Sequence, residues 1–255
     1  GGGRVSGVDA TARRWLRCYR PRPTASVRLV CFPHATGSAP FYRSWAVELP
    51  DGIELLAVQY PGRLDRIGEP PVTSMDVLAD MVAEVLAPRR DLPVALFGHS
   101  MGAAVAYEVA RRLERRHDGP LAHLFVSGRP APRHHRPGSK HLGPDDDLWA
   151  ELRRLNGTDP AALDNPQLRA ALLPTLRADY RLIESYRPVE GELLATPISA
   201  LVGDVDTEAA VDEVAAWAEY TRAAFDLTVF DGDHFYLVPH RTKVLAGVIR
   251  SLGLP

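Results

Sequence analysis

A pentapeptide near the middle of the chain restricts the available folds more than any other feature. Residues 98–102 read Gly-His-Ser-Met-Gly, which has the form G-x-S-x-G. The apolar run 92–97 precedes it, and residues 101–116 follow with alanines and other apolar side chains at helical spacing. In such a strand, turn and helix, the glycines permit a sharp bend that raises the serine hydroxyl above the sheet edge. This context favours Ser100 as a nucleophile over the alternative, a glycine-rich loop with a solvated serine.

Short apolar runs recur along the chain and alternate with helical patterns. The runs expected to be strands are residues 15–19, 28–32, 53–58, 92–97, 121–126, 197–202 and 225–230. Strands that alternate with helices predict one α/β domain with a mostly parallel central sheet flanked by helices. With 255 residues, 45% of them hydrophobic, the chain is long enough to bury a large core. We place this core at residues 11–128 and 192–255, after a flexible tail at residues 1–10.

The character of the sequence changes at residues 129–191, between two predicted strands. Residues 129–143 are rich in Arg, His and Pro and poor in aliphatic side chains, which predicts a mobile basic loop. The helical pattern of residues 144–186 predicts a lid. Its apolar stripes either line the path of an acyl chain or pack the lid onto the body, and both interpretations stay open. His134 and His135 have no acidic or thiolate ligand at a familiar spacing, so we expect no metal site.

The charge balance and the cysteines limit the setting in which the chain works. Lys and Arg number 30 against 32 Asp and Glu, a formal net charge of −2, so no overall field marks a binder of nucleic acid or of a membrane surface. Arg63 and Arg66, in a turn after a predicted strand, either hold an anionic group or are solvated, and we favour solvated side chains. No apolar stretch approaches the roughly 20 residues of a membrane span, and no signal-peptide core is present, so we expect a cytoplasmic protein. Cys18 and Cys31 form no C-x-x-C motif and are expected to be reduced, with Cys31 buried.

Two further loops place acid and base side chains just beyond predicted strands. Residues 203–206 read Gly-Asp-Val-Asp and follow the run 197–202, whereas His234 follows the run 225–230. The carboxyl ends of parallel strands share one edge of a sheet, so these side chains are expected to meet Ser100 there. Serine, acid and histidine in this chain order are typical of α/β-hydrolases. His234 would then act as general base, oriented by a carboxylate, and at this point either acid of the loop fits that role.

Other residues near the turn at residues 98–102, which we call the elbow, leave alternatives for the base and for the oxyanion donors. His34 and His99 compete with His234 as the base, although His99 is fixed beside Ser100 and His34 precedes the elbow in the chain. Residues 33–38 form a loop of small side chains after a predicted central strand. The backbone N–H groups of such a loop either bind an oxyanion or belong to a plain strand-to-helix connection, and the residues alone favour neither.

Several segments together point to a known family. They are Phe32-Pro33-His34-Ala35 with Gly37, Gln59-Tyr60-Pro61-Gly62-Arg63, the elbow, residues 152–158 (Leu-Arg-Arg-Leu-Asn-Gly-Thr) and Gly232-Asp233-His234-Phe235-Tyr236-Leu237. Through them the chain resembles, nearly end to end, the stand-alone type II thioesterases that accompany modular polyketide synthases and nonribosomal peptide synthetases. Members commonly have tyrosine where His34 stands and glycine where Thr36 and Asp233 stand.

The resemblance implies an α/β-hydrolase fold and a set of functional residues. It assigns the nucleophile to Ser100, the base to His234 and the acid to Asp206. It also implies an oxyanion hole made by the backbone N–H groups of Ala35 and Met101.

The resemblance further implies a substrate and partners. The expected reaction is hydrolysis of acyl thioesters on the phosphopantetheine arm of acyl or peptidyl carrier proteins, which clears aberrant or stalled acyl groups. No cofactor is expected beyond the arm that the substrate carries, and the enzyme is expected to be a monomer. Residues 129–140 either dock an acidic carrier protein or form a solvated basic loop. A chain-terminating thioesterase that cyclises its product, a general carboxylesterase and a non-catalytic binding protein are the alternatives.

Overall fold

In the computed structural model, which describes residues 7–117 and 119–255, a central sheet organises the chain. Its strands are β1 (Leu16–Arg17), β2 (Val27–Phe32), β3 (Ile53–Val58), β4 (Val94–His99), β5 (His123–Ser127), β6 (Ile198–Gly203) and β7 (Phe225–Phe230). Within the described residues they form a seven-stranded sheet in the order β1-β3-β2-β4-β5-β6-β7. Only β1 runs antiparallel to its neighbour β3, and the pairs from β3 to β7 are parallel. The predicted α/β architecture is confirmed.

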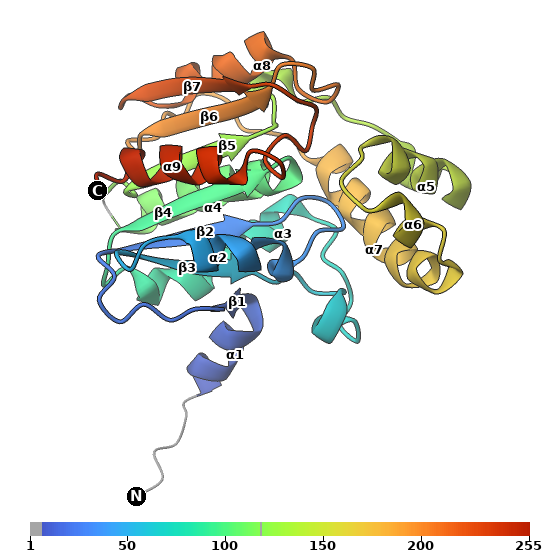
Figure 1. Ribbon diagram of the computed structural model, residues 1–255, viewed down its shortest axis with the longest axis horizontal. Helices are drawn as coiled ribbons and strands as arrows, with labels where there is room; N and C mark the ends of the chain where they lie inside the picture. Colours follow the sequence, from blue (N-terminus) through green and yellow to red (C-terminus); the bar gives the residue numbers. More distant parts are fainter. Residues whose placement is uncertain (1–6, 118) are drawn as a thin grey trace, which may run out of the picture.

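Helices cover both faces of this sheet and one of its ends (Figure 1). They are α1 (Gly7–Trp15), α2 (Arg43–Glu48), α3 (Met75–Leu86), α4 (Met101–His117), α5 (Asp145–Arg154), α6 (Pro160–Leu163), α7 (Pro166–Ser185), α8 (Val211–Ala215) and α9 (Arg241–Ser251). Helices α2 and α9 lie on one face, and α3 and α4 lie on the other. Helices α5, α6 and α7 project to one side of the sheet, and we call residues 145–185 the helical cap.

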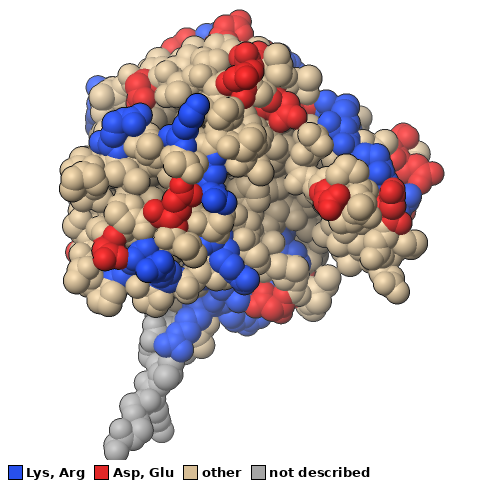
Figure 2. Space-filling view, in the orientation of Figure 1, with Lys and Arg blue, Asp and Glu red and all other residues tan. Residues whose placement is uncertain are grey.

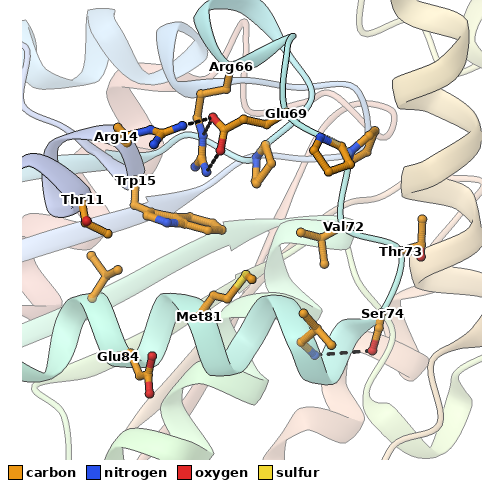
Figure 3. Close-up of a pocket in the computed structure, with 15 residues that line it drawn as sticks. Thr11, Arg14, Trp15, Arg66, Glu69, Val72, Thr73, Ser74, Met81 and Glu84 are labelled. Atoms are coloured by element: carbon orange, nitrogen blue, oxygen red, sulfur yellow. Dashed lines mark hydrogen bonds and ion pairs between the residues drawn. The ribbon is translucent and has the colours of Figure 1, made fainter.

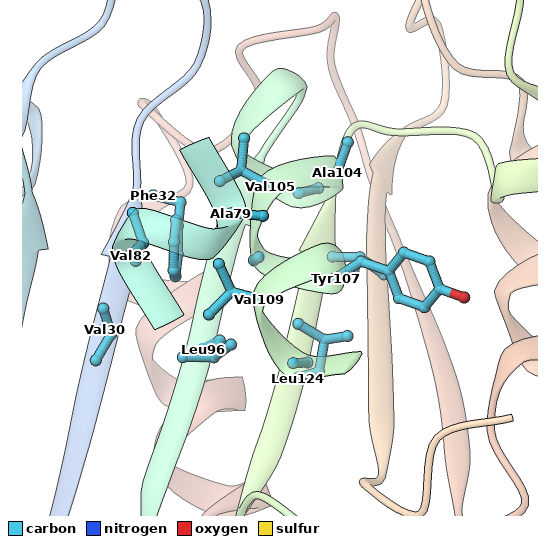
Figure 4. Close-up of a cluster of buried hydrophobic side chains, with 14 of the residues drawn as sticks. Val30, Phe32, Ala79, Val82, Leu96, Ala104, Val105, Tyr107, Val109 and Leu124 are labelled. Carbon is cyan, nitrogen blue, oxygen red and sulfur yellow. The ribbon is translucent and has the colours of Figure 1, made fainter. Parts of the chain in front are cut away.

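The hydrophobic core has two parts because side chains alternate between the faces of a strand. Val30 and Phe32 of β2 belong to the cluster that includes α3 and α4, part of which Figure 4 shows. Leu29 and Cys31 of the same strand belong to the cluster beneath α2 and α9. Burial on both faces explains why the central strands read as continuous apolar runs in the sequence.

The helical cap has a smaller core of its own. Leu148, Trp149, Leu152, Leu163 and Leu176 are buried against one another. Helix α7 begins with Pro166 after the N-cap Asn165, whose side chain accepts hydrogen bonds from two N–H groups of the first turn. Much of the apolar stripe of the cap therefore packs the cap itself.

The structure differs from the sequence-based expectations in two segments. Residues 1–6 of the expected tail lie outside the described residues, whereas residues 7–10 belong to α1. That helix continues to Trp15, so the strand expected at residues 15–19 is reduced to Leu16–Arg17. The basic loop 129–143, which was expected to be mobile, contains two 3-10 turns and buries Ala131. Near its end, two backbone N–H groups donate to the Glu184 carboxylate on α7.

The surface and the cysteines complete the description. Both cysteines are free, with Cys31 buried as predicted and Cys18 exposed. Basic and acidic side chains are interspersed over the face shown in Figure 2. Across the part of the chain that the structure describes, no helix combines the length and the apolar character that a membrane span needs.

Candidate functional site

The elbow between β4 and α4 has an unusual backbone conformation that depends on its two glycines. Ser100 has φ of 55°, in the left-handed region that side chains other than glycine seldom adopt. Its N–H donates to the carbonyl of Ser127 at 2.8 Å, which fixes the turn against β5. A Cβ on Gly98 would lie 2.1 Å from the carbonyl oxygen of Gly102, and one on Gly102 would lie 2.1 Å from that of Phe32. Both glycines are therefore required by the close approach of the backbone.

An acid and the candidate base meet beyond β6 and β7. The Nδ1 atom of His234 lies 3.0 Å and 2.9 Å from the two carboxylate oxygens of Asp206. The imidazole is 4% exposed and the carboxylate is fully buried, so this pair is shielded from water. Asp204 is exposed and accepts the N–H of Gly232 instead. Of the two acids that the sequence left open, the structure brings Asp206 to the imidazole.

Ser100 and His234 line one small cavity beneath the helical cap. Its walls are His34, Ala35, Thr36, Ser100, Leu152, Leu155, Gly157, Thr158, His234 and Phe235. Its volume is about 30 Å³, which is room for about two water molecules. This space is too small for an acyl chain, and Leu152, Leu155, Gly157 and Thr158 of the cap close one side of it.

The two N–H groups expected to form an oxyanion hole belong to Ala35, which lines this cavity, and to Met101, which follows Ser100 in the chain. Met101 is the first residue of α4, so its N–H has no carbonyl partner within the helix and lies at the positive end of the helix dipole. Ala35 follows β2 in a turn closed by a 2.9 Å hydrogen bond from Gly37 N–H to the carbonyl of His34. The turn bond does not use the N–H of Ala35. Both groups are therefore candidate donors to an oxyanion that develops next to Ser100.

A buried ion pair connects this turn to the helical cap. Asp179 of α7 receives two hydrogen bonds of 2.8 Å from the guanidinium of Arg63 and one of 2.8 Å from the N–H of Thr36. Arg63 also donates to the carbonyl of Gly37 at 3.0 Å. Thr36 has φ of 62°, which is costly for a residue with a branched Cβ. The carboxylate on the cap therefore holds a strained turn of the core.

The sequence analysis missed this connection. It interpreted Arg63 and Arg66 as solvated, yet both are buried, and Arg66 donates to Glu69 at 2.7 Å. It also did not single out Asp179. The signal was available, because this acid lies among apolar residues on the buried face of a helix, where an unpaired carboxylate is rare.

The two competing histidines have other environments than His234. Burial lowers the pKa of His34 to about 3, and the neighbouring His234 and Arg63 act in the same direction. Burial also lowers the pKa of His99 well below its ordinary value. The Nδ1 atom of His99 pairs with the hydroxyl of Ser127 at 2.9 Å, and its ring centroid lies 4.9 Å from that of His234. Both rings are therefore neutral near pH 7, and His99 supports the imidazole of His234 from one side.

A larger cavity of about 610 Å³ lies elsewhere, between α1 and α3 (Figure 3). Trp15 forms part of its wall and stacks under the guanidinium of Arg66 at 4.2 Å. Glu69 pairs there with Arg14 as well as with Arg66. Neither Ser100 nor His234 borders this cavity, so its size does not make it the reaction site. Among the described residues, no cluster of three or more His, Cys, Asp or Glu is arranged to hold a metal ion.

Comparison with known proteins identifies the family. The model of the thioesterase domain matches residues 27–252. Thioesterase PikA5 of Streptomyces venezuelae is 43% identical over 224 residues, which are 88% of this chain and 80% of that protein. The structure of BorB, the type II thioesterase of the borrelidin biosynthetic cluster, is similar with a TM-score of 0.88 at 46% identity, covering 94% of this chain and 98% of that one. The RedJ thioesterase of the prodiginine pathway in Streptomyces coelicolor gives 0.85 at 38% identity over 91% and 92% of the two chains. The chain belongs to the thioesterase family, and within it to the type II thioesterases of polyketide and nonribosomal peptide clusters, which are serine hydrolases of α/β-hydrolase fold.

Proposed function

We propose that this thioesterase hydrolyses acyl thioesters on the phosphopantetheine arm of acyl or peptidyl carrier proteins and so removes aberrant or stalled acyl groups from a synthase. One observation carries the proposal: a strained elbow places Ser100 at the same cavity as an imidazole that is held by a buried carboxylate. Relatives named for gramicidin S biosynthesis, the borrelidin biosynthetic cluster and the yersiniabactin NRPS/PKS pathway support the choice of substrate. The enzyme acts as a monomer in the cytoplasm, where the carrier proteins are.

In the first half-reaction, Ser100 Oγ attacks the thioester carbonyl while Nε2 of His234 takes the hydroxyl proton. Asp206 fixes the tautomer that leaves Nε2 free and stabilises the imidazolium that forms. The N–H groups of Ala35 and Met101 donate to the carbonyl oxygen as it becomes an oxyanion. When the C–S bond breaks, the thiol of the arm leaves with the proton from His234, and the acyl group remains on Ser100.

In the second half-reaction, water replaces the thiol. Nε2 of His234 removes a proton from a water molecule that attacks the acyl-enzyme carbonyl. The same two N–H groups stabilise the second oxyanion, and its collapse returns the proton to Ser100 Oγ and releases a carboxylic acid.

We propose the boundaries of the parts as follows. Residues 11–128 and 192–255 form the hydrolase core, and residues 129–191 form the lid with its basic loop. The small volume beneath residues 152–158 supports a lid that opens for each substrate.

The test is the release of a radiolabelled short acyl group from a holo acyl carrier protein. The wild type is compared with Ser100→Ala, and a simple oxygen ester of the same acid is measured in parallel. We expect fast thioester release by the wild type, loss of at least about 10³-fold in the variant, and little turnover of the oxygen ester.

Other results would identify other functions. Equal or faster turnover of the oxygen ester would indicate a general carboxylesterase. A cyclic product from a long hydroxyacyl substrate would indicate a chain-terminating enzyme. Equal rates for the wild type and Ser100→Ala would exclude Ser100 as the nucleophile.

A further inference from the structure

A separate cavity of about 270 Å³ lies between the basic loop and helix α7. The loop contributes Arg129, His135 and Lys140 to its wall, and α7 contributes Tyr180 and Ile183. Positive charge therefore lines one side of the cavity and apolar surface lines another.

The wall of this cavity is continuous with the support of the candidate base. Arg129 follows Gly128, and a Cβ on that glycine would lie 3.4 Å from Cε1 of His234. Glu208, also in the wall, donates its N–H to a carboxylate oxygen of Asp206 at 2.8 Å. The carbonyl of Arg129 is fixed in turn by the indole N–H of Trp217 at 2.8 Å. Two residues of the cavity wall, Arg129 and Glu208, are thus connected through the backbone to the surroundings of His234 and Asp206.

Most charges around the cavity are neutralised by other protein groups. Lys140 pairs with Glu151 at 2.7 Å, and Arg136 pairs with Glu213. Of the two carboxylates in the wall, Glu208 pairs with Arg154. The other, Glu184, accepts the N–H groups of Lys140 and His141 at 2.8 Å each and also contacts the His141 ring.

Arg129 is the exception. Within residues 7–117 and 119–255, no carboxylate lies within ion-pair distance of its guanidinium, whose side-chain partner is Nδ1 of His135 at 2.6 Å. An arginine has only donors, so Nδ1 is the acceptor and the imidazole is neutral. Burial lowers the pKa of Arg129 to about 10, and the smaller opposite effects of Tyr186 and Glu208 do not offset it, so the side chain is still cationic near pH 7. A mostly buried cation without a counter-ion is unfavourable unless an anion joins it.

We propose that this cavity binds the phosphate group of the phosphopantetheine arm, with the Arg129 guanidinium as its ion-pair partner. The inference rests on the proposed function, because it is the carrier-protein substrate that brings this anion to every reaction. The planar fork of an arginine matches two phosphate oxygens, and the apolar wall at Tyr180 and Ile183 suits the chain that leads from the phosphate toward the thioester. A carboxylate on the acyl group is the other anion that such a substrate can offer.

The test compares two thioesters of the same acyl group, one on pantetheine and one on 4′-phosphopantetheine, with the wild type and Arg129→Met. We expect the wild type to have a kcat/KM roughly 10- to 100-fold higher for the phosphorylated substrate, and Arg129→Met to lose that preference, measured as the ratio of its two kcat/KM values. Arg133→Met is the matched control. It removes an exposed arginine of the same loop that pairs with Glu219, and it is expected to keep the preference. Arg129→Lys keeps the charge without the fork and is expected to be intermediate.

Each other result has a defined meaning. An equal loss on both substrates, with the wild-type preference intact, would overturn the phosphate site. A loss confined to malonyl-pantetheine relative to propionyl-pantetheine would also overturn it and would make the acyl carboxylate the ligand. If the wild type hydrolyses neither thioester, the proposed function fails. Calorimetric binding of 4′-phosphopantetheine against pantetheine, to the wild type and Arg129→Met, then decides the phosphate site alone.

Discussion

Replacing Asp179 with alanine leaves the Arg63 guanidinium without its counter-ion and the Thr36 N–H without its acceptor. Arg63 is 5% exposed and the carboxylate is 2% exposed, so water cannot readily take the place of the lost acceptor. Breaking a buried ion pair from one side costs about 3–5 kcal/mol of unfolding free energy, because the remaining charge stays buried. Thr36 loses the acceptor of its N–H as well, so we expect Asp179→Ala to fall at the upper end of this range.

Activity is expected to fall for a separate reason. The N–H of Ala35 is oriented by a turn whose next residue, Thr36, is held in a strained conformation by Asp179. Loss of one complete oxyanion donor lowers kcat by about 10²–10³-fold, and this is the largest loss expected when the Ala35 N–H is only displaced. We therefore expect Asp179→Ala to lower kcat by about 10-fold or more within that limit, with a smaller effect on KM.

The assay is urea unfolding followed by tryptophan fluorescence and far-UV circular dichroism, together with thioester kinetics. Coincidence of the two transitions checks that one free energy describes the unfolding. Asp164→Ala is the matched control, because it removes an exposed ion pair with Arg153 on the same cap and is expected to cost no more than about 1 kcal/mol.

A double variant separates stability from activity. Arg63→Met with Asp179→Leu replaces the whole buried pair by apolar side chains, which is expected to recover much of the stability. It still leaves the N–H of Thr36 without its acceptor, so kcat is expected to remain low. The reasoning is refuted if Asp179→Ala costs no more than Asp164→Ala, or if the double variant recovers kcat together with stability.

Three other changes test the site. Asp206→Asn is expected to lower kcat by about 10⁴-fold, because it favours the wrong tautomer of the His234 imidazole. Asp204→Asn is expected to change kcat less than about twofold, because that acid only accepts a loop N–H. Equal losses of thioester hydrolysis in the two variants would contradict the assignment of Asp206. His34 has a lowered pKa, so its stabilising effect is complete above pH 6.5 and is lost as the pH falls toward 3. His34→Tyr is expected to reduce the slope of unfolding free energy against pH in that window by up to about 1.4 kcal/mol per pH unit. An unchanged slope, measured by urea unfolding at a series of pH values, would contradict this prediction. Gly128→Ala introduces a Cβ 2.6 Å from the His99 ring, at a φ of 60°. Because His99 supports the His234 imidazole, kcat is expected to fall more than KM changes. A fully active variant would show that the position of the His234 imidazole does not depend on this packing.

Local patterns predicted the parts of this molecule that depend on local chemistry. The elbow is visible because its two glycines are needed by atoms only a few residues away or on the adjacent strand. The central strands are visible because they are buried on both faces and therefore read as apolar runs. In contrast, helix α1 contains Gly7 and several charged residues, so its sequence does not strongly indicate a helix. The contact between Trp15 at its end and Arg66 is seen only in the structure.

The rest required three-dimensional information. Asp204 and Asp206 stand in one short turn after β6, and which of them reaches His234 depends on the conformation of that turn. Arg63 and Asp179 are 116 residues apart, so no local pattern pairs them. The loop 129–143 is poor in aliphatic side chains, but two of its backbone N–H groups donate to the Glu184 carboxylate, which composition does not reveal.

The pair between Arg63 and Asp179 also limits how these enzymes can be recombined. A chimaera that takes residues 145–185 from one parent and the remainder from another inherits the carboxylate from the first and the guanidinium from the second. A cap from a parent that lacks the acid at position 179 would keep the small apolar core of the cap but would leave the N–H of Thr36 without its acceptor. Cap exchange intended to change acyl preference therefore has to treat positions 36, 63 and 179 as one inherited unit.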